Sequence, residues 1–84
     1  EFLILMPEAQ AQADGVTMGE RLRQAIAGLA LDSPAGERMA LSASFGVSGW
    51  LATDSSSVDV LRRADHALYT AKEKGRNCVV LRAE

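Results

Sequence analysis

Hydrophobic positions recur at two different spacings along the chain, and the change between them predicts alternating strands and helices. A continuous apolar run over residues 2–6 stops at Pro7 and has the length of a strand buried on both faces. Residues 9–29 instead carry apolar or small side chains at steps of three and four, which predicts an amphipathic helix. These positions are Val16, Gly19, Leu22, Ile26 and Leu29. Gly15 and Gly19 weaken its first half by about 1 kcal/mol each relative to Ala.

Turn-forming residues at 33–36 separate this helix from the clearest strand pattern in the chain. In residues 39–48 the odd positions are apolar and the even positions are small or hydroxylated, a period of two that predicts one strand. Its apolar face should pack on a core. The other face leaves room for a close approach because its side chains are small; it consists of Ser42, Ser44, Gly46 and Ser48.

A second helix is predicted to begin where Ser56 and Asp59 form a capping box. Its buried stripe is expected to follow the helical spacing of apolar residues, at Val58, Leu61, Ala64, Leu68 and Ala71. Gly75 is a suitable left-handed end for this helix, and residues 78–81 read as a final strand.

The predicted order is strand, helix, strand, helix, strand, without an internal repeat or a linker. Such an order is typical of the α/β class, or of α+β, in which helices pack on a layered sheet. We therefore expect residues 1–84 to be part of one single domain.

Several individual side chains also have an expected place. Arg62 and Arg63 should lie on the solvated face of the second helix. His66 should lie on the surface, because no second His or Cys stands nearby to complete a metal site. Tyr69 is expected to pack in the core with its hydroxyl at the rim, and Cys78 to be a small buried residue.

Composition narrows the possible functions. The 84 residues carry a formal net charge of −2, so no basic field favours nonspecific binding to nucleic acid. The single cysteine excludes an internal disulfide, and no apolar run approaches the ~20 residues that span a bilayer. The first residues lack the basic region of a signal peptide. We expect a cytoplasmic domain, and any membrane anchor would lie upstream of Glu1.

Candidate chemistry lies at the end of the second helix. Lys72 precedes Arg76 by about one helical turn, so the two cations can converge. A flexible ammonium group and a planar guanidinium together suit a diphosphate or triphosphate. From composition alone, the alternative that both side chains only cap carbonyls and solvate the helix end is favoured.

A resemblance to a known family changes this balance. Residues 61–80 contain Ala-Asp, Ala-Leu-Tyr, Ala-Lys, Gly-Arg-Asn and a Val-Val strand, and they resemble the closing segment of GGDEF-type diguanylate cyclase domains. Residues 20–26 resemble the long helix of that family, and residues 44–47 resemble its central strand. Glu1 and Phe2 resemble the last two residues of the Gly-Gly-Asp/Glu-Glu-Phe turn. The whole chain is thus similar to the C-terminal half of a GGDEF domain.

The resemblance implies a homodimeric domain that condenses two GTP molecules into cyclic di-GMP, a bacterial second messenger. This is phosphoryl transfer assisted by a divalent metal, Mg²⁺ or Mn²⁺. Glu1 matches an acidic position near the metal ions, and it would be both catalytic and metal-binding. Lys72 and Arg76 match the phosphate-contacting pair. Arg21 is a candidate secondary inhibitory contact for the product, although Arg21 and Arg23 read by residue type as solvated charges.

Several parts of the family pattern precede Glu1. They are the glycines and first acid of the turn, the metal-binding Asp, the guanine-reading Asn and Asp, and the Arg-x-x-Asp inhibitory site. With one acid of the metal site, the 84 residues alone are predicted to lack cyclase activity. The alternative is a degenerate GGDEF domain that binds GTP or a partner and regulates an attached domain. The residue immediately before Glu1 discriminates between the two.

Overall fold

The structure, a computed structural model, describes residues 4, 12–32 and 34–83. Its elements in chain order are α1 (Gln12–Ala27), β1 (Ala30–Asp32), β2 (Arg38–Ala40), β3 (Phe45–Val47), α2 (Ser57–Glu73) and β4 (Val79–Leu81). β1 and β2 form an antiparallel pair, and β3 and β4 form a separate parallel pair. This combination of helices with a small parallel sheet confirms the predicted class in its α+β form. The predicted first strand, apart from Ile4, lies outside the described residues.

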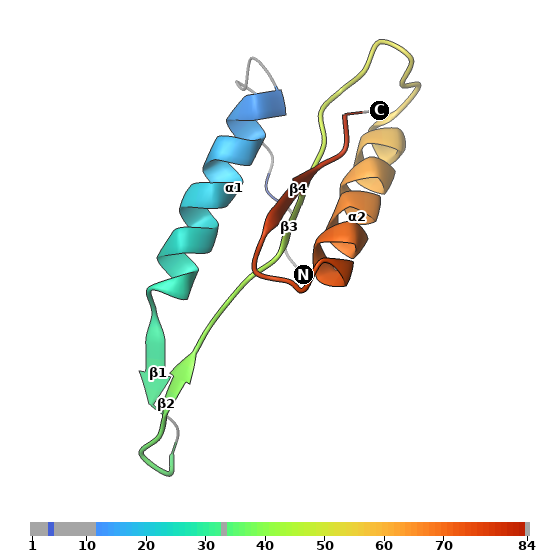
Figure 1. The fold of residues 1–84 in the computed structure, drawn as a ribbon. Helices are drawn as coiled ribbons and strands as arrows, with labels where there is room; N and C mark the ends of the chain where they lie inside the picture. Colours follow the sequence, from blue (N-terminus) through green and yellow to red (C-terminus); the bar gives the residue numbers. More distant parts are fainter. Residues whose placement is uncertain (1–3, 5–11, 33, 84) are drawn as a thin grey trace.

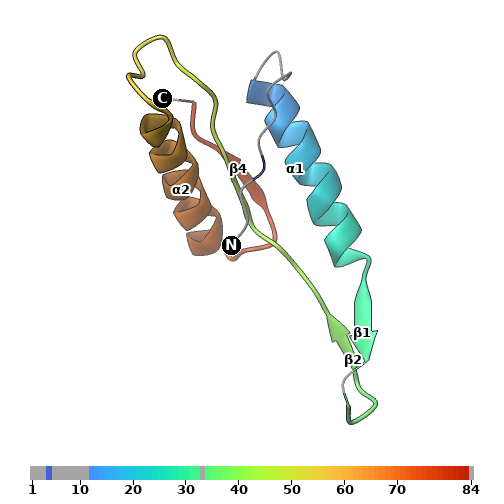
Figure 2. The same cartoon turned by 180° about the vertical axis from the view of Figure 1, so that it is seen from behind.

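The two helices lie on opposite sides of the β3–β4 pair, as Figure 1 and Figure 2 show. Gly19 of α1 faces Val79 of β4 and Phe45 of β3, since an added Cβ atom would lie 3.2 Å from Val79 Cγ1. Gly46 instead faces the backbone of α2. Successive strand residues point to opposite faces, so Phe45 and Gly46 must turn toward different helices. The layers are therefore helix, sheet and helix.

The small-residue face of β3 is the place where α2 approaches the sheet. A Cβ atom at Gly46 would overlap backbone atoms of Ala64 and would lie 2.9 Å from Leu68 Cα. Helix backbone cannot move aside as a flexible side chain can, so only glycine fits here. On the same face, Ser48 Oγ donates a hydrogen bond to Val60 O at 2.6 Å. The predicted close approach is confirmed, and the approaching element is α2.

The glycines of α1 allow a similar approach on the other face. A Cβ atom at Gly15 would lie 2.7 Å from Val47 Cγ1, and Gly19 is buried. The helix loses propensity at these positions but gains a closer contact with the sheet. The predicted end of the helix is too late, because the helix stops at Ala27 and Leu29 beyond it is 55 % exposed.

The pattern over residues 39–48 belongs to two strands, not one. Arg38–Ala40 pairs with β1, whereas Phe45–Val47 pairs with β4, and residues 41–44 between them are not strand. The β1–β2 hairpin projects from one end of the molecule (Figure 1). The prediction of one continuous strand is wrong, because alternation specifies which way side chains point but not which strand is the partner.

The first strand of this hairpin, β1, was not predicted either. Residues 30–32 lie between the predicted end of the first helix at Leu29 and the predicted turn at 33–36, and Gly28 and Leu29 separate them from α1. The predicted turn after them is confirmed at Gly36, whose φ of 83° lies in the left-handed region that glycine adopts without strain.

Helix α2 begins at the predicted capping box. Ser56 Oγ accepts a hydrogen bond from Val58 N at 3.3 Å, and Asp59 Oδ2 accepts one from Ser56 N at 3.3 Å. The two side chains therefore satisfy backbone donors that the first turn of a helix leaves without partners, which fixes where α2 starts.

The buried face of α2 is made of alanine. Ala67 and Ala71 are 1 % and 0 % exposed, whereas Val58 is 53 % exposed and Leu61 is 42 % exposed. The predicted stripe is therefore wrong at Val58 and Leu61, and it omits Ala67. Gly46 meets the backbone of α2 at Ala64 and Leu68, and so close a contact between helix and sheet favours small side chains on the covered face of the helix.

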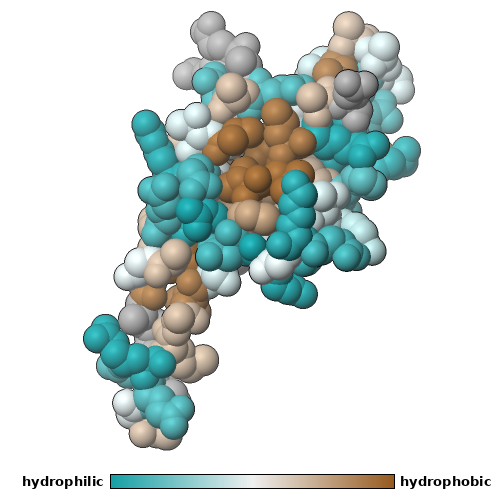
Figure 3. Space-filling view, in the orientation of Figure 1, coloured by the Kyte–Doolittle hydropathy of each residue, from teal (hydrophilic) through white to brown (hydrophobic). Residues whose placement is uncertain are grey.

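The described part of the molecule has a small core and a large apolar surface. Figure 3 shows apolar side chains gathered over β4, between the two helices. Tyr69 is 63 % exposed, so the prediction that it packs in the core is wrong. A hydrogen bond with Glu73 raises the pKa of its hydroxyl. Cys78 is half-buried, with Sγ 3.5 Å from Ala71 O.

Candidate functional site

The predicted phosphate-binding residues lie at the C-terminal end of α2. Lys72 is in the last turn of the helix and Arg76 follows shortly after it; both are exposed. No carboxylate of the described residues forms a salt bridge with either side chain. Two positive charges are thus presented to solvent at this end of the helix.

The helix end directs the chain back toward the sheet. Gly75 N donates to Lys72 O at 3.3 Å, and Arg76 N donates to Ala71 O at 3.0 Å. With Gly75 at φ 106°, these bonds form a Schellman motif, in which the last carbonyls of the helix find partners. The predicted left-handed glycine is confirmed, and it carries Arg76 around the helix end.

The left-handed conformation continues past the glycine. Arg76 has a φ of 67° and Asn77 a φ of 49°. Asparagine tolerates this region, but an arginine there costs about 1–2 kcal/mol relative to the right-handed region. Strained backbone of this kind persists only where surrounding contacts hold it. We call residues 75–77 the left-handed turn.

Contacts from two other elements hold this turn. Asn77 N donates to Ser44 Oγ at 3.1 Å, in the segment before β3. Arg23 of α1 donates from NH1 to Asn77 Oδ1 at 3.2 Å. Phe45 N donates to Cys78 O at 2.9 Å, which starts the β3–β4 ladder immediately after the turn. α1, β3 and α2 therefore all meet at the left-handed turn.

Arg23 is itself held by Glu20. Arg23 Nε donates to both Oε atoms of Glu20 at 3.0 Å, and NH2 contacts Oε1. This pairing raises the pKa of Arg23 and lowers the pKa of Glu20, in each case chiefly through the shared hydrogen bonds. The prediction that Arg23 is a solvated charge is wrong, because only 21 % of its side chain is exposed and its guanidinium is paired with Glu20. Its three-residue spacing from Glu20 is the sequence signal that could have shown the pair.

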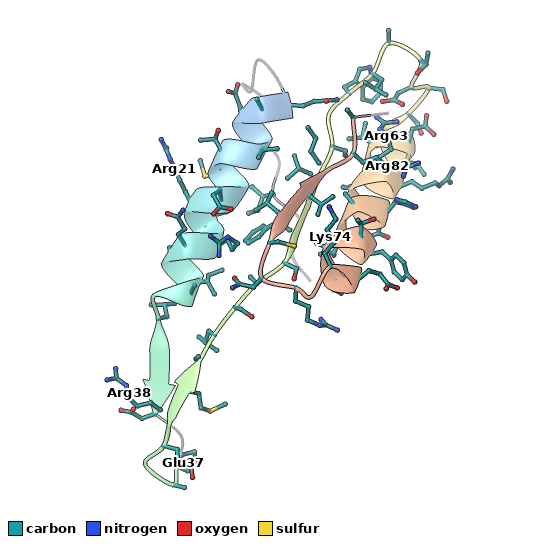
Figure 4. The ribbon with its side chains drawn as sticks, in the orientation of Figure 1. Arg21, Glu37, Arg38, Arg63, Lys74 and Arg82 are labelled. Atoms are coloured by element: carbon teal, nitrogen blue, oxygen red, sulfur yellow. The ribbon has the colours of Figure 1, made fainter. Side chains whose placement is uncertain are left out.

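Arg21 lies on the exposed side of α1, two residues before Arg23. Figure 4 shows its side chain pointing away from the β3–β4 pair. Arg21 belongs to α1 and Lys72 to α2, and the role of Arg21 as a separate contact for the product stays a prediction. Glu1, the predicted catalytic and metal-binding acid, lies outside the described residues.

The opposite end of α2 holds a second polar cluster. Arg63 NH1 donates to Asp54 Oδ1 at 2.7 Å, and NH2 donates to Gly49 O at 2.8 Å. The two side chains are 13 % and 4 % exposed, so the prediction that Arg63 is solvated is wrong. Arg63 lowers the pKa of Asp54. Leu51 N also donates to Asp54 Oδ2, at 2.8 Å, which closes the loop before the helix.

A shallow hollow of about 560 Å³ opens at this end. Arg63 and Arg82 line it together (Figure 4), and Arg82 NH1 lies 2.8 Å from His66 Nδ1. Asp54 and Asp59 also line it, but the first pairs with Arg63 and the second caps the helix. The charges of the hollow are therefore largely engaged in the fold, and the candidate site remains the other end of α2.

A metal site is not assembled by the described residues. Within residues 4, 12–32 and 34–83, no three His, Cys, Asp or Glu side chains gather closely enough to hold an ion. In the same residues, no helix is long and apolar enough to cross a membrane.

Comparison with known proteins decides the family. The sequence profile described as "Diguanylate cyclase, GGDEF domain" matches residues 1–78. The chain belongs to the GGDEF domain family. The resemblance of the 61–80 segment to the closing part of this family is therefore confirmed.

Relatives and solved structures agree with this GGDEF assignment. The response regulator PleD of Caulobacter vibrioides is 36 % identical over 84 residues, which cover 99 % of this chain and 18 % of PleD. Diguanylate cyclase A of Treponema denticola is 31 % identical over 81 residues, covering 96 % of this chain and 21 % of that protein. The chain spans about a fifth of the length of these relatives.

The fold also matches a solved GGDEF domain. The structure of the GGDEF domain of DgcB from Caulobacter crescentus, in complex with c-di-GMP, superposes with a TM-score of 0.77 at 30 % identity. The match covers 86 % of this chain and 43 % of that one. More than half of the DgcB chain has no matching residues in the present chain. The large apolar surface seen here accords with that difference.

Proposed function

We propose that the complete domain to which this chain contributes is a diguanylate cyclase that condenses two GTP molecules into cyclic di-GMP. The single observation that carries the proposal is the match of residues 1–78 to the diguanylate cyclase GGDEF family. The relatives that match are themselves named as diguanylate cyclases or as PleD, and the matched DgcB domain binds c-di-GMP. We expect the domain to work in the cytoplasm, where GTP is available.

The share of this chain in the reaction is to hold phosphate. Lys72 and Arg76 are exposed, carry no carboxylate partner among the described residues, and stand at one end of one helix. In phosphoryl transfer the protein acts mainly by positioning and by stabilising charge on the phosphate oxygens. An ammonium group supplies a mobile positive charge, and a guanidinium supplies two parallel donors to the oxygens.

Glu1 is the residue of this chain that would hold a divalent cation, Mg²⁺ or Mn²⁺. A carboxylate oxygen is a ligand that such hard cations prefer. Bound there, the ion would neutralise charge on the phosphates. The described residues add no further group of metal ligands, so further ligands would have to come from elsewhere in the domain.

Arg21 is proposed as a secondary contact for the product, across a homodimer in which each domain presents one GTP. Its support is its exposure and its direction away from the sheet, which suit contact with a second molecule (Figure 4).

The phosphate role is tested by replacing Lys72 and Arg76 together with alanine in the full-length protein. We expect GTP affinity and cyclic di-GMP formation to fall at least about a hundredfold, since two charge-assisted contacts are lost. Lys74→Ala is the matched control, because it removes an exposed lysine between the two. Unchanged GTP affinity in the double variant, or an equal loss in the control, would remove the assigned role.

A further inference from the structure

In the left-handed turn, Arg76 adopts a backbone conformation that arginine does not favour. Residues 75–77 have φ values of 106°, 67° and 49°, and of the three residues arginine is the one that adopts such a value only with strain. The Schellman bonds of Gly75 and Arg76 account for the first part of the turn. They do not reach Asn77, so the direction in which the chain leaves Arg76 needs another constraint.

Asn77 receives that constraint from two elements distant in sequence. Its backbone N–H donates to Ser44 Oγ, and its side-chain Oδ1 accepts from Arg23 NH1, 54 residues earlier in the chain. The first contact fixes the turn relative to β3, and the second fixes it relative to α1. The segment before β3 and helix α1 thus together define the position of one residue, next to Arg76.

Arg23 is well suited to act as a fixed point. Its Nε and NH2 groups are engaged by Glu20 in the same helix, which leaves NH1 directed toward Asn77. A guanidinium is planar, so two bonds to Glu20 also set the direction of the third nitrogen. Glu20 therefore orients Arg23, and Arg23 orients Asn77.

We propose that Asn77 is a positioning residue for phosphate binding, held by Arg23 and Ser44 so that Arg76 is presented at the end of α2 beside Lys72. The proposal rests on the proposed phosphate role of Arg76 and adds the residues that make Arg76 competent. Asn77 itself needs no contact with the nucleotide. Its function is to keep the left-handed turn in one conformation.

The test is made in the full-length protein, with GTP and GMP as probes. GMP lacks the two outer phosphates, so the ratio of the two affinities reports the phosphate grip and is insensitive to a general loss of folded protein. We expect Asn77→Ala to lower GTP affinity about tenfold, through loss of one hydrogen bond from a charged group, and to leave GMP affinity within about twofold.

Two replacements at the same position separate the side chain from the backbone. Asn77→Asp keeps an oxygen acceptor for Arg23 and tolerates the left-handed region, so it should restore the GTP-to-GMP ratio to within about twofold of the natural protein. Asn77→Gly keeps the backbone freedom but loses the acceptor, and it should behave like Asn77→Ala. Full activity in Asn77→Gly would show that Arg23 does not act through Asn77, and would overturn the proposal.

A double-variant cycle links Asn77 to Arg76. Once Arg76→Ala has removed the guanidinium, adding Asn77→Ala should cause no further loss in GTP affinity. Arg23→Ala should reproduce the effect of Asn77→Ala, whereas Arg62→Ala, at an exposed arginine on α2, should not.

The outcomes distinguish the positioning role of Asn77 from the phosphate-binding role of Arg76. If Arg76→Ala lowers GTP affinity but Asn77→Ala does not, or if Asn77→Ala lowers GTP and GMP affinity equally, the positioning role is overturned and the phosphate role stands. If Arg76→Ala leaves GTP affinity unchanged, the phosphate role itself fails, and the positioning role fails with it.

Discussion

The two ends of α2 use arginine in opposite ways. At the N-terminal end, the guanidinium of Arg63 is covered, paired with Asp54 and bonded to the carbonyl of Gly49. At the C-terminal end, Arg76 is exposed on a strained turn and no carboxylate of the described residues pairs with it. Arg63 is therefore paired within the folded protein. Arg76 is exposed to solvent, and the residues that hold its turn do not neutralise its charge. Residue type therefore does not assign either role; the surrounding acceptors do.

The largest expected effect concerns activity. The isolated 84 residues should form no detectable cyclic di-GMP from GTP and Mg²⁺, because one acid gives the ion too few fixed oxygen ligands. The measurement is product formation, with the full-length protein as the positive control. Product from the isolated chain would break the comparison, because the C-terminal end of α2 would then be a complete site and not a partial one.

The next largest effect concerns the stability of the fold, on which both ends of α2 depend. Gly46→Val in the full-length protein places a side chain into the backbone of α2 and should lower the free energy of unfolding by about 3 kcal/mol or more. Denaturant unfolding measures it. Gly28→Ala is the control, since its added Cβ would lie at an ordinary 3.5 Å from Gln24 O, and it should stay within about 0.5 kcal/mol. Equal stability of the two variants would contradict the close approach of α2 to β3.

A smaller effect should separate Arg63 from its neighbour. Arg63→Ala leaves the covered carboxylate of Asp54 without its charged partner and should lower the thermal midpoint of the full-length protein by roughly 5 °C. Arg62→Ala, at an exposed position one residue earlier, should change it by less than about 2 °C. GTP affinity of the folded Arg63→Ala variant should remain unchanged, and a selective loss of GTP binding would place function at both ends of the helix.

The smallest effect is a pH dependence at the N-terminal end. Arg63 holds the pKa of Asp54 below its ordinary value of 3.8. A depressed carboxyl pKa contributes stability above the unfolded pKa and loses it as the pH falls through the folded pKa. Asp54→Asn should therefore be less stable than the natural protein at pH 7, and this difference should shrink below about pH 4. A difference that stays constant down to pH 3 would contradict the assignment.

Local chemistry accounts for what could be predicted. The capping box at Ser56 and the left-handed Gly75 depend on residues within one turn of each other, and both are confirmed. The helical spacing located α1 and α2, and the period of two located the small face of β3. The family resemblance, which the profile match confirms, also predicts that Lys72 and Arg76 contact phosphate, and that role stays a prediction.

Contacts between distant residues account for what could not. The same alternating pattern covers β2 and β3, and only their pairing with β1 and β4 separates them. The helical spacing alone placed Val58 on the covered face, whereas the packing of α2 on the sheet leaves Val58 exposed and covers Ala67.

The sequence by itself determined the family, the positions of the two helices and the two ends of α2, because capping, periodicity and motif spacing act over a few residues. The tertiary structure alone decided which arginines find partners in distant parts of the chain. Arg63 meets Asp54 across a loop, and Arg23 meets Asn77 across 54 positions of the chain. Burial and pairing depend on which acceptors the fold brings within about 3 Å, and that distance is set by the packing of both helices on one sheet.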